Sequence, residues 1–97
     1  MESIESIKAK LLEHKPFLEQ EYKVKEIGIF GSFARGEQAE ESDIDILVEF
    51  SEPIGFFRFI DLEDHLSDIL GLKVDLVSRK ALKPNIGKNI LSELVAV

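Results

Sequence analysis

The sequence contains no cysteine, no tryptophan and no long hydrophobic run. Without cysteine the chain cannot form a disulfide, so its composition does not indicate secretion, and we expect it in a reducing cytoplasm. No apolar stretch approaches the roughly 20 residues that cross a bilayer. Residues 1–5 have neither the basic start nor the apolar centre of a signal peptide. We therefore expect no membrane partner.

Positive charge is also scarce, because 12 Lys and Arg stand against 19 Asp and Glu, for a net charge of −7. From Arg79 onward the balance is reversed, and Glu93 is the one acid in that segment. Proteins that bind nucleic acid usually present a basic surface that displaces phosphate counterions. Direct nucleic-acid binding is therefore not expected. A nucleoside triphosphate could still bind, since metal ions and backbone amides can supply positive potential.

The length and apolar content predict one small globular domain over residues 1–97. Three stretches are rich in β-branched residues and are predicted as strands: residues 24–30, 44–50 and 73–77. Gly28, inside the first strand, indicates that a backbone or side chain passes close by. In the second strand one face is apolar: Ile44, Ile46, Val48 and Phe50. The opposite face carries Asp43, Asp45, Leu47 and Glu49.

Helical spacing of apolar residues predicts the remaining elements. An amphipathic helix is expected over residues 3–14, and Pro16 is expected to end it or to start a new turn, with a short second helical piece around residues 17–22. A long helix is expected over residues 56–70, ended by Gly71. Its predicted apolar face consists of Phe56, Phe59, Ile60, Leu66, Ile69 and Leu70. Pro84 introduces a last helical segment with Ile86, Ile90, Leu91 and Leu94 at helical spacing.

The tail, residues 95–97, is either a final strand or a frayed end. The order of elements predicts an α/β fold with a small mixed β-sheet flanked by helices. If the third strand lies beside the second, the carboxylate of Asp75 could converge with those of Asp43 and Asp45.

The first chemical signal is the turn at Gly31 and Ser32, which follows a strand and opens a short helix over residues 32–35. Such a turn leaves backbone N–H groups unpaired, and glycine lets a phosphate approach the backbone closely. Taken alone, a Gly-Ser pair is more often a turn glycine followed by an N-cap serine. Arg35 could contact a triphosphate or could simply pair with Glu37.

The second signal is the pair of aspartates that opens the second strand. Residues i and i+2 of a strand lie about 6.6 Å apart at Cα, so Asp43 and Asp45 can share one or two hard cations such as Mg²⁺. Two such ions can stabilise the attacking and leaving oxygens of a phosphoryl-type transfer. Asp75 could be a third ligand or a general base. Each of these aspartates, taken alone, is more often a solvated residue. His14 and His65 lack ligand spacing and are expected on the surface.

The joint pattern is more specific than its parts, and it resembles the nucleotidyltransferase superfamily that includes DNA polymerase β. The matching stretches are residues 31–36, residues 42–48 and Asp75 within residues 74–77. The short chain resembles the minimal nucleotidyltransferase (MNT) type in particular. The resemblance implies a polymerase β-like fold, in which Gly31 and Ser32 bind phosphates. It also implies that Asp43 and Asp45 hold two Mg²⁺ ions and that Asp75 is the third carboxylate.

MNT proteins are commonly antitoxins of HEPN-domain ribonuclease toxins, so the resemblance also implies an activity and a partner. The implied reaction transfers AMP from ATP to a tyrosine hydroxyl of the toxin. The small size of the chain and its spare apolar faces are also compatible with a hetero-oligomer. Two alternatives stay open. The chain could be a binding antitoxin that masks its partner through apolar helix faces, or it could transfer nucleotides to RNA with a basic surface supplied by another chain.

Overall fold

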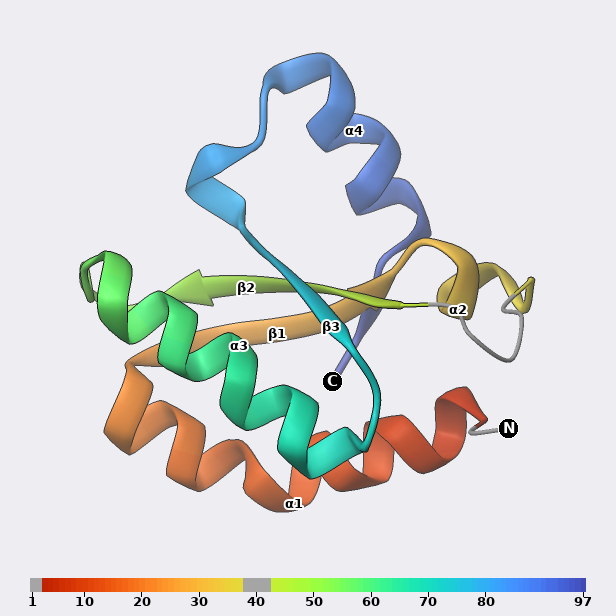
Figure 1. Cartoon of the computed structure of the whole chain (residues 1–97). Helices are drawn as coiled ribbons and strands as arrows, with labels where there is room; N and C mark the ends of the chain where they lie inside the picture. Colours follow the sequence, from red (N-terminus) through yellow and green to blue (C-terminus); the bar gives the residue numbers. More distant parts are fainter. Residues whose placement is uncertain (1–2, 38–42) are drawn as a thin grey trace.

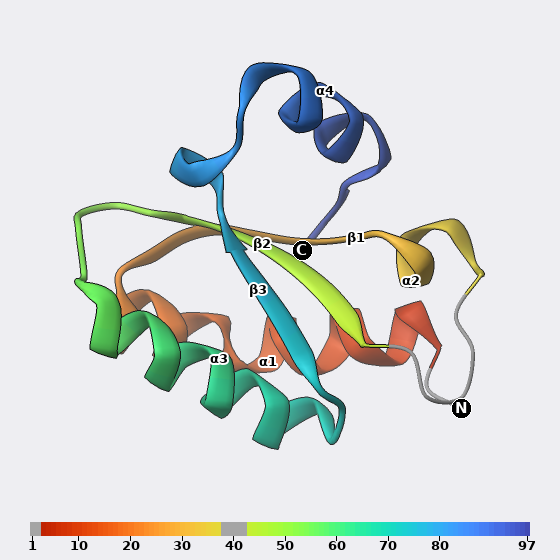
Figure 2. The ribbon, with the colours of Figure 1, turned by 45° about the horizontal axis from the view of Figure 1, so that its top comes forward.

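A computed structural model describes residues 3–37 and 43–97, with the side chain of Ile86 also outside the description. The element order is α1 (Ile4–Tyr22), β1 (Val24–Phe30), α2 (Ser32–Arg35), β2 (Ile44–Phe50), α3 (Phe56–Leu70), β3 (Val74–Ser78), a 3₁₀ turn η1 (Arg79–Ala81), α4 (Pro84–Glu93) and β4 (Val95–Ala96). The four strands form one sheet in the order β3-β2-β1-β4. The sheet lies between α1 and α3 on one side and α4 on the other (Figures 1 and 2). The predicted α/β class is confirmed.

The sheet is mixed because of how its strands are connected. β1 pairs antiparallel with β2 and with β4, whereas β2 pairs parallel with β3. The parallel pair needs a crossover, and α3 supplies it. β4 shows that the tail is a final strand, extended by a bond from the Val97 amide to the Ile27 carbonyl (N···O 3.0 Å).

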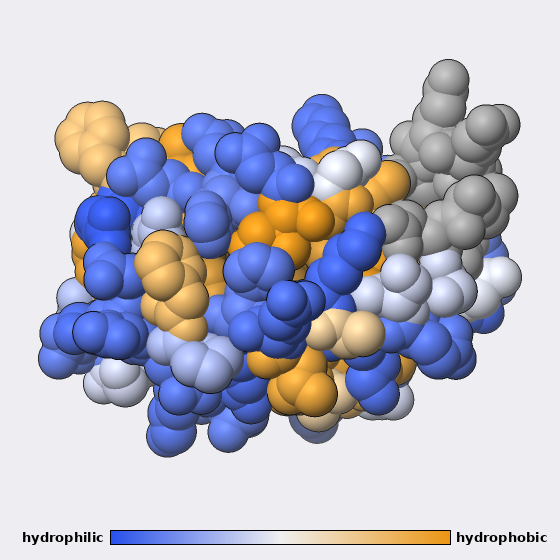
Figure 3. All heavy atoms as spheres, turned by 90° about the horizontal axis from the view of Figure 1, so that it is seen from below, coloured by the Kyte–Doolittle hydropathy of each residue, from blue (hydrophilic) through white to orange (hydrophobic). Residues whose placement is uncertain are grey.

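The hydrophobic core lies between the sheet and the α1–α3 layer. The alternating residues of β2 predicted on the apolar face are buried there, with Ile44, Ile46 and Val48 fully buried and Phe50 packed at the edge. From the helices the core receives Ile7, Leu11, Leu18, Tyr22, Leu62, Leu66 and Leu70. Seen from the side of α1 and α3, the outer surface is mostly hydrophilic, with hydrophobic side chains in separate patches (Figure 3).

α1 corrects the prediction made for Pro16, which lies inside one continuous helix rather than at its end. Proline in a helix interior removes one hydrogen bond and crowds the preceding turn. The helix continues because its buried stripe does: Ile7 and Leu11 before the proline and Leu18 and Tyr22 after it pack on the same core. Tertiary packing therefore outweighs the local cost of the proline.

α3 corrects the predicted apolar face of the long helix. Its buried stripe is Leu62, Leu66 and Leu70, and Gly71 caps it in the left-handed conformation, as predicted. Phe56 and Ile60, which were expected on that face, are 71% and 37% exposed. Measured around the helix axis at about 100° per residue, Phe56 lies about 80° and Ile60 about 120° from Leu66. Both side chains therefore leave the stripe.

The C-terminal segment covers part of the opposite face of the sheet. Leu94, just after α4, lies over Gly28, where an added Cβ would stand 2.7 Å from Leu94 Cδ1. This is the close approach that the glycine in β1 predicted. Leu91 of α4 stays 39% exposed.

The expectation that both histidines lie on the surface is wrong. The His65 ring packs against the rings of Phe17 and Tyr22, with centroid distances of 5.1 and 5.9 Å. His14 is half-buried, and its Nδ1 lies 2.9 Å from the Lys10 carbonyl oxygen, four residues back along α1.

Within the described residues, no helix combines the length and the apolar character needed to span a membrane.

Candidate active site

The parallel register of β2 and β3 places Asp45 directly opposite Asp75. The neighbours of each aspartate along its strand are buried in the core, so both carboxylates leave the sheet on the other face, the one over which α4 stands. Asp45 is half-buried and Asp75 is exposed. The expected juxtaposition of these two side chains is present in the structure, and their function as metal ligands stays a prediction.

The electrostatic environment raises the pKa of Asp45. Partial burial is the largest cause, because it disfavours the charged carboxylate, and the charges of Asp75 and Asp43 add to it. A hydrogen bond between the Asp45 and Asp75 side chains raises the pKa further, and only Arg35 opposes the shift. Concentrated negative charge of this kind is relieved by a cation.

Asp43 lies at the edge of this cluster, immediately before β2, and is exposed. The Ile44 amide that follows it donates to the Lys73 carbonyl (2.9 Å), which ties this point of the chain to the start of β3. The Asp43 carboxylate lies 3.9 Å from Lys73 Nζ, with both side chains largely exposed, so the ion pair is weak. Asp43 thus adds a third negative charge, near enough to raise the pKa of Asp45. Ser42, which the sequence motif also includes, lies outside the described residues.

These side chains fit a hard cation that also binds phosphates. Within residues 3–37 and 43–97, no three His, Cys, Asp or Glu side chains are placed so that they could hold a metal ion together. The donors present are carboxylates: Asp45 and Asp75 are paired across β2 and β3, and Asp43 stands just before β2. Mg²⁺ prefers oxygen ligands and commonly binds through one or two carboxylates plus substrate phosphates and water. That Asp43, Asp45 and Asp75 supply the ligands of such an ion stays a prediction.

The Gly31 turn lies against Asp45. The last residue of β1, Phe30, pairs with Asp45 across the sheet, and Gly31 follows at φ 74° and ψ −149°. A Cβ built on Gly31 would overlap Asp45 Oδ2 and stand 3.0 Å from Asp45 Cγ. This position therefore requires glycine both for its backbone conformation and for the space that the carboxylate occupies. Ser32 is not the N-cap, because Gly31 holds that position and Ser32 is the first residue of α2.

Glu93 joins this site from the far end of the chain, and sequence reasoning missed it. Glu93 Oε1 accepts a hydrogen bond from the Gly31 amide (3.1 Å), and both of its oxygens accept from Arg35 Nη1 (3.2 and 3.1 Å). Arg35 also pairs with Glu37 (Nε–Oε2 2.7 Å), as the sequence had allowed. The one available signal was that Glu93 is a lone acid in a basic segment.

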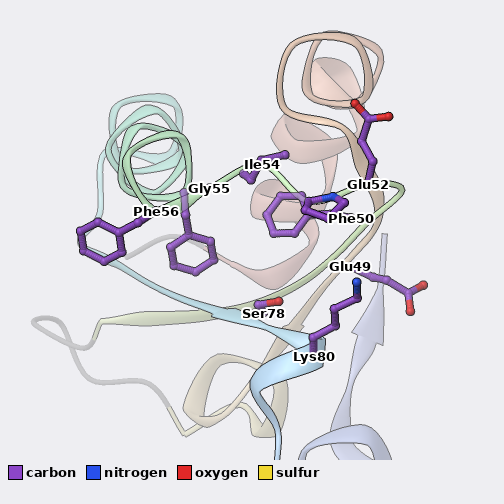
Figure 4. Close-up of a pocket in the computed structure, with 10 residues that line it drawn as sticks. Glu49, Phe50, Glu52, Ile54, Gly55, Phe56, Ser78 and Lys80 are labelled. Carbon is purple, nitrogen blue, oxygen red and sulfur yellow. The ribbon is translucent and has the colours of Figure 1, made fainter.

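The hollow drawn in Figure 4 lies away from the carboxylates. It has a volume of about 280 Å³ and lies at the opposite end of β2 from Asp45. Figure 4 shows Phe50 and Phe56 on one side of it and Lys80 on the other. It therefore does not belong to the Asp45–Asp75 cluster.

The chain is similar to known proteins over most of its length. Residues 11–97 match the family model described as "Nucleotidyltransferase domain". The putative protein adenylyltransferase MJ0128 of Methanocaldococcus jannaschii is 55% identical over 98 residues. The alignment covers the whole of this chain and the whole of MJ0128. Protein adenylyltransferase MntA of Thermococcus cleftensis is 47% identical over 97 residues, which is all of this chain and 98% of that one.

Two solved structures agree. A minimal nucleotidyltransferase structure superposes with a TM-score of 0.85 at 30% identity and covers 99% of this chain and 97% of the other. A toxin–antitoxin structure with AMP-PNP superposes at 0.70 with 26% identity, covering 93% of this chain and 68% of that one. The chain belongs to the nucleotidyltransferase family, and its fold is that of the polymerase β-like members. Within that family it is a protein adenylyltransferase of the MntA-like, minimal type.

Proposed function

We propose that residues 1–97 act as a minimal catalytic domain that uses Mg²⁺ to transfer AMP from ATP to a tyrosine hydroxyl of a cognate HEPN toxin, and so acts as an antitoxin. The relatives named as protein adenylyltransferases support the reaction class. The toxin–antitoxin structure with AMP-PNP supports an adenine nucleotide as the substrate and a toxin as the partner. The resemblance to MNT antitoxins supports the HEPN class of that toxin.

One observation supports the proposal above the others: three separate segments bring Asp45, Asp75 and Gly31 to one point of the sheet. Asp45 is paired with Asp75 in the parallel register and with Phe30, next to Gly31, in the antiparallel one. Such an arrangement places carboxylates for a metal ion beside a backbone turn that a phosphate can approach. Neither feature alone indicates nucleotide transfer.

The proposed reaction forms a bond between the acceptor oxygen and the α-phosphorus and breaks the bond from that phosphorus to the bridging oxygen of pyrophosphate. Asp75 accepts the proton of the attacking hydroxyl, directly or through water. Gly31, Ser32 and Arg35 bind the triphosphate oxygens and hold the leaving group in line. Asp43 and Asp45 would hold Mg²⁺, which would supply positive charge for the phosphates and for the attacking and leaving oxygens.

The test is direct labelling. The protein is mixed with a HEPN protein that binds it, with Mg²⁺ and with ATP labelled on the α-phosphate. We expect label on the toxin, and peptide mass spectrometry should place the AMP on tyrosine. If the two proteins bind each other and the toxin stays unlabelled, the proposal is wrong. Label on RNA instead of protein would identify the other transferase alternative.

A binding antitoxin remains the second candidate, because one observation favours it. Phe56 and Phe57 at the start of α3 are 71% and 83% exposed, and their rings contact each other. Adjacent exposed aromatic rings are unusual on a surface without a partner. A variant with Asp43→Asn and Asp45→Asn separates the candidates: if it still silences the toxin at equal stoichiometry, binding alone is sufficient.

A further inference from the structure

We propose that Glu93 competes with the nucleotide: its carboxylate occupies the donors that the triphosphate must use, and it thereby sets the affinity for nucleotide. This inference rests on the proposed function, in which Gly31 and Arg35 bind phosphate. It concerns a residue at the end of α4, 62 positions along the chain from Gly31.

The contacts of Glu93 are those of a bound anion. One oxygen accepts from the Gly31 amide at 3.1 Å and from Arg35 Nη1 at 3.2 Å, and the other accepts from the same nitrogen at 3.1 Å. A carboxylate held by a backbone amide and a guanidinium reproduces the way in which two phosphate oxygens are commonly held. Glu93 is thus an internal substitute for a phosphate.

A phosphate and Glu93 cannot share the Gly31 amide. The Gly31 amide has a single hydrogen, so an oxygen of the triphosphate takes it only after Glu93 Oε1 has left. The negative charge of Glu93 would also repel the triphosphate, in a site where Asp45, Asp75 and Asp43 already concentrate negative charge. Binding of the nucleotide must therefore include the displacement of Glu93.

The substitution Glu93→Gln isolates this effect. Glutamine keeps the side-chain length, and its carbonyl oxygen can still accept from the Gly31 amide, but the negative charge and the second carboxylate oxygen are lost. Competition predicts tighter binding of nucleotide to the variant, because a weaker occupant is displaced more easily. A merely structural function of Glu93, holding the Gly31 turn in shape, predicts weaker binding.

Glu37→Gln is the matched control. Glu37 pairs with the same guanidinium, through Arg35 Nε at 2.7 Å, whereas the Gly31 amide donates to Glu93. Both substitutions remove one negative charge and one acid partner of Arg35. If lower negative charge alone strengthens nucleotide binding, the affinity should rise in both variants. If Glu93 competes for the Gly31 amide, the affinity should rise only in Glu93→Gln.

The experiment is a calorimetric titration of the wild type and both variants with AMP-PNP in excess Mg²⁺, after thermal unfolding has verified that each is folded. We expect the Kd of Glu93→Gln to fall roughly three- to tenfold, the range of one net hydrogen bond, and that of Glu37→Gln to stay within about twofold. An unchanged or higher Kd for Glu93→Gln overturns the inference, and so does an equal gain in Glu37→Gln. If none of the three proteins binds AMP-PNP, the proposed function fails and the inference fails with it.

Discussion

Gly31→Ala is the substitution whose effect follows most directly from the coordinates. Alanine would have to adopt φ 74° and ψ −149°, a region that costs side-chain-bearing residues about 1–3 kcal/mol. Its Cβ would also overlap Asp45 Oδ2 and force that side chain out of its rotamer, at about 0.5–1.5 kcal/mol. Together these effects predict a loss of about 1.5–4.5 kcal/mol in the free energy of unfolding. In a domain of this size, each kcal/mol lowers Tm by about 4–8 °C.

The same substitution should abolish transfer of AMP even at temperatures where the variant is folded, because Asp45 would no longer face Asp75 as it does now. Gly71→Ala is the control. Gly71 also has positive φ (66°), but an added Cβ there meets no atom within 4 Å, and it lies at the end of α3. We expect it to lose about 1–2 kcal/mol from backbone strain alone and to keep full activity. Thermal unfolding and labelled transfer measure both effects. Normal transfer by folded Gly31→Ala would refute the reasoning about Asp45.

Further predictions concern the charge of Asp45, Mg²⁺ binding and the proline inside α1. Asp45→Asn should stabilise the metal-free protein at neutral pH by up to about 1 kcal/mol, since it removes a half-buried charge next to Asp43 and Asp75; a lower Tm in EDTA would contradict this. Folding raises the pKa of Asp45 above its ordinary value of about 4. The free energy of unfolding of the wild type should therefore fall as the pH rises from about 4 through the raised pKa. Asp45→Asn should make this fall smaller, as measured by unfolding curves at several pH values. Added Mg²⁺ should raise the Tm of the wild type and not that of Asp45→Asn, and equal shifts would argue against a site at Asp45. Pro16→Ala should stabilise the protein by about 1–3 kcal/mol by restoring one hydrogen bond inside α1, and an unchanged denaturation midpoint would show that the helix had already relaxed around the proline.

The elements that surround the site were readable from the sequence because their signals are local. The period of two in β2 assigned Ile44, Ile46 and Val48 to the core and Asp45 to the other face, as the structure has them. Val74 and Leu76 are buried beside an exposed Asp75 for the same reason. Periodicity could not supply the pairing of β3 with β2, which is parallel and is connected through the crossover helix α3.

The errors lie where tertiary packing decides the outcome. Pro16 is a strong local signal for a helix end, but the stripe from Ile7 to Tyr22 continues across it at spacings of four and seven residues and packs on one core. In α3 an apolar composition was mistaken for an apolar face, although Phe56 and Ile60 are offset from the Leu62–Leu70 stripe. Glu93 could not be found by motif reasoning, because its contact with Gly31 depends on where α4 lies over the sheet.

The most direct test measures the transfer of AMP to the toxin from ATP labelled on the α-phosphate, under single-turnover conditions. It compares three variants that each replace one aspartate by asparagine. Asp45→Asn and Asp75→Asn each neutralise one member of the facing pair, and Asp68→Asn removes an exposed carboxylate from α3, on the other side of the sheet. The account predicts that the first two lose transfer by orders of magnitude while Asp68→Asn retains the wild-type rate. Wild-type transfer by folded Asp45→Asn or Asp75→Asn would contradict it.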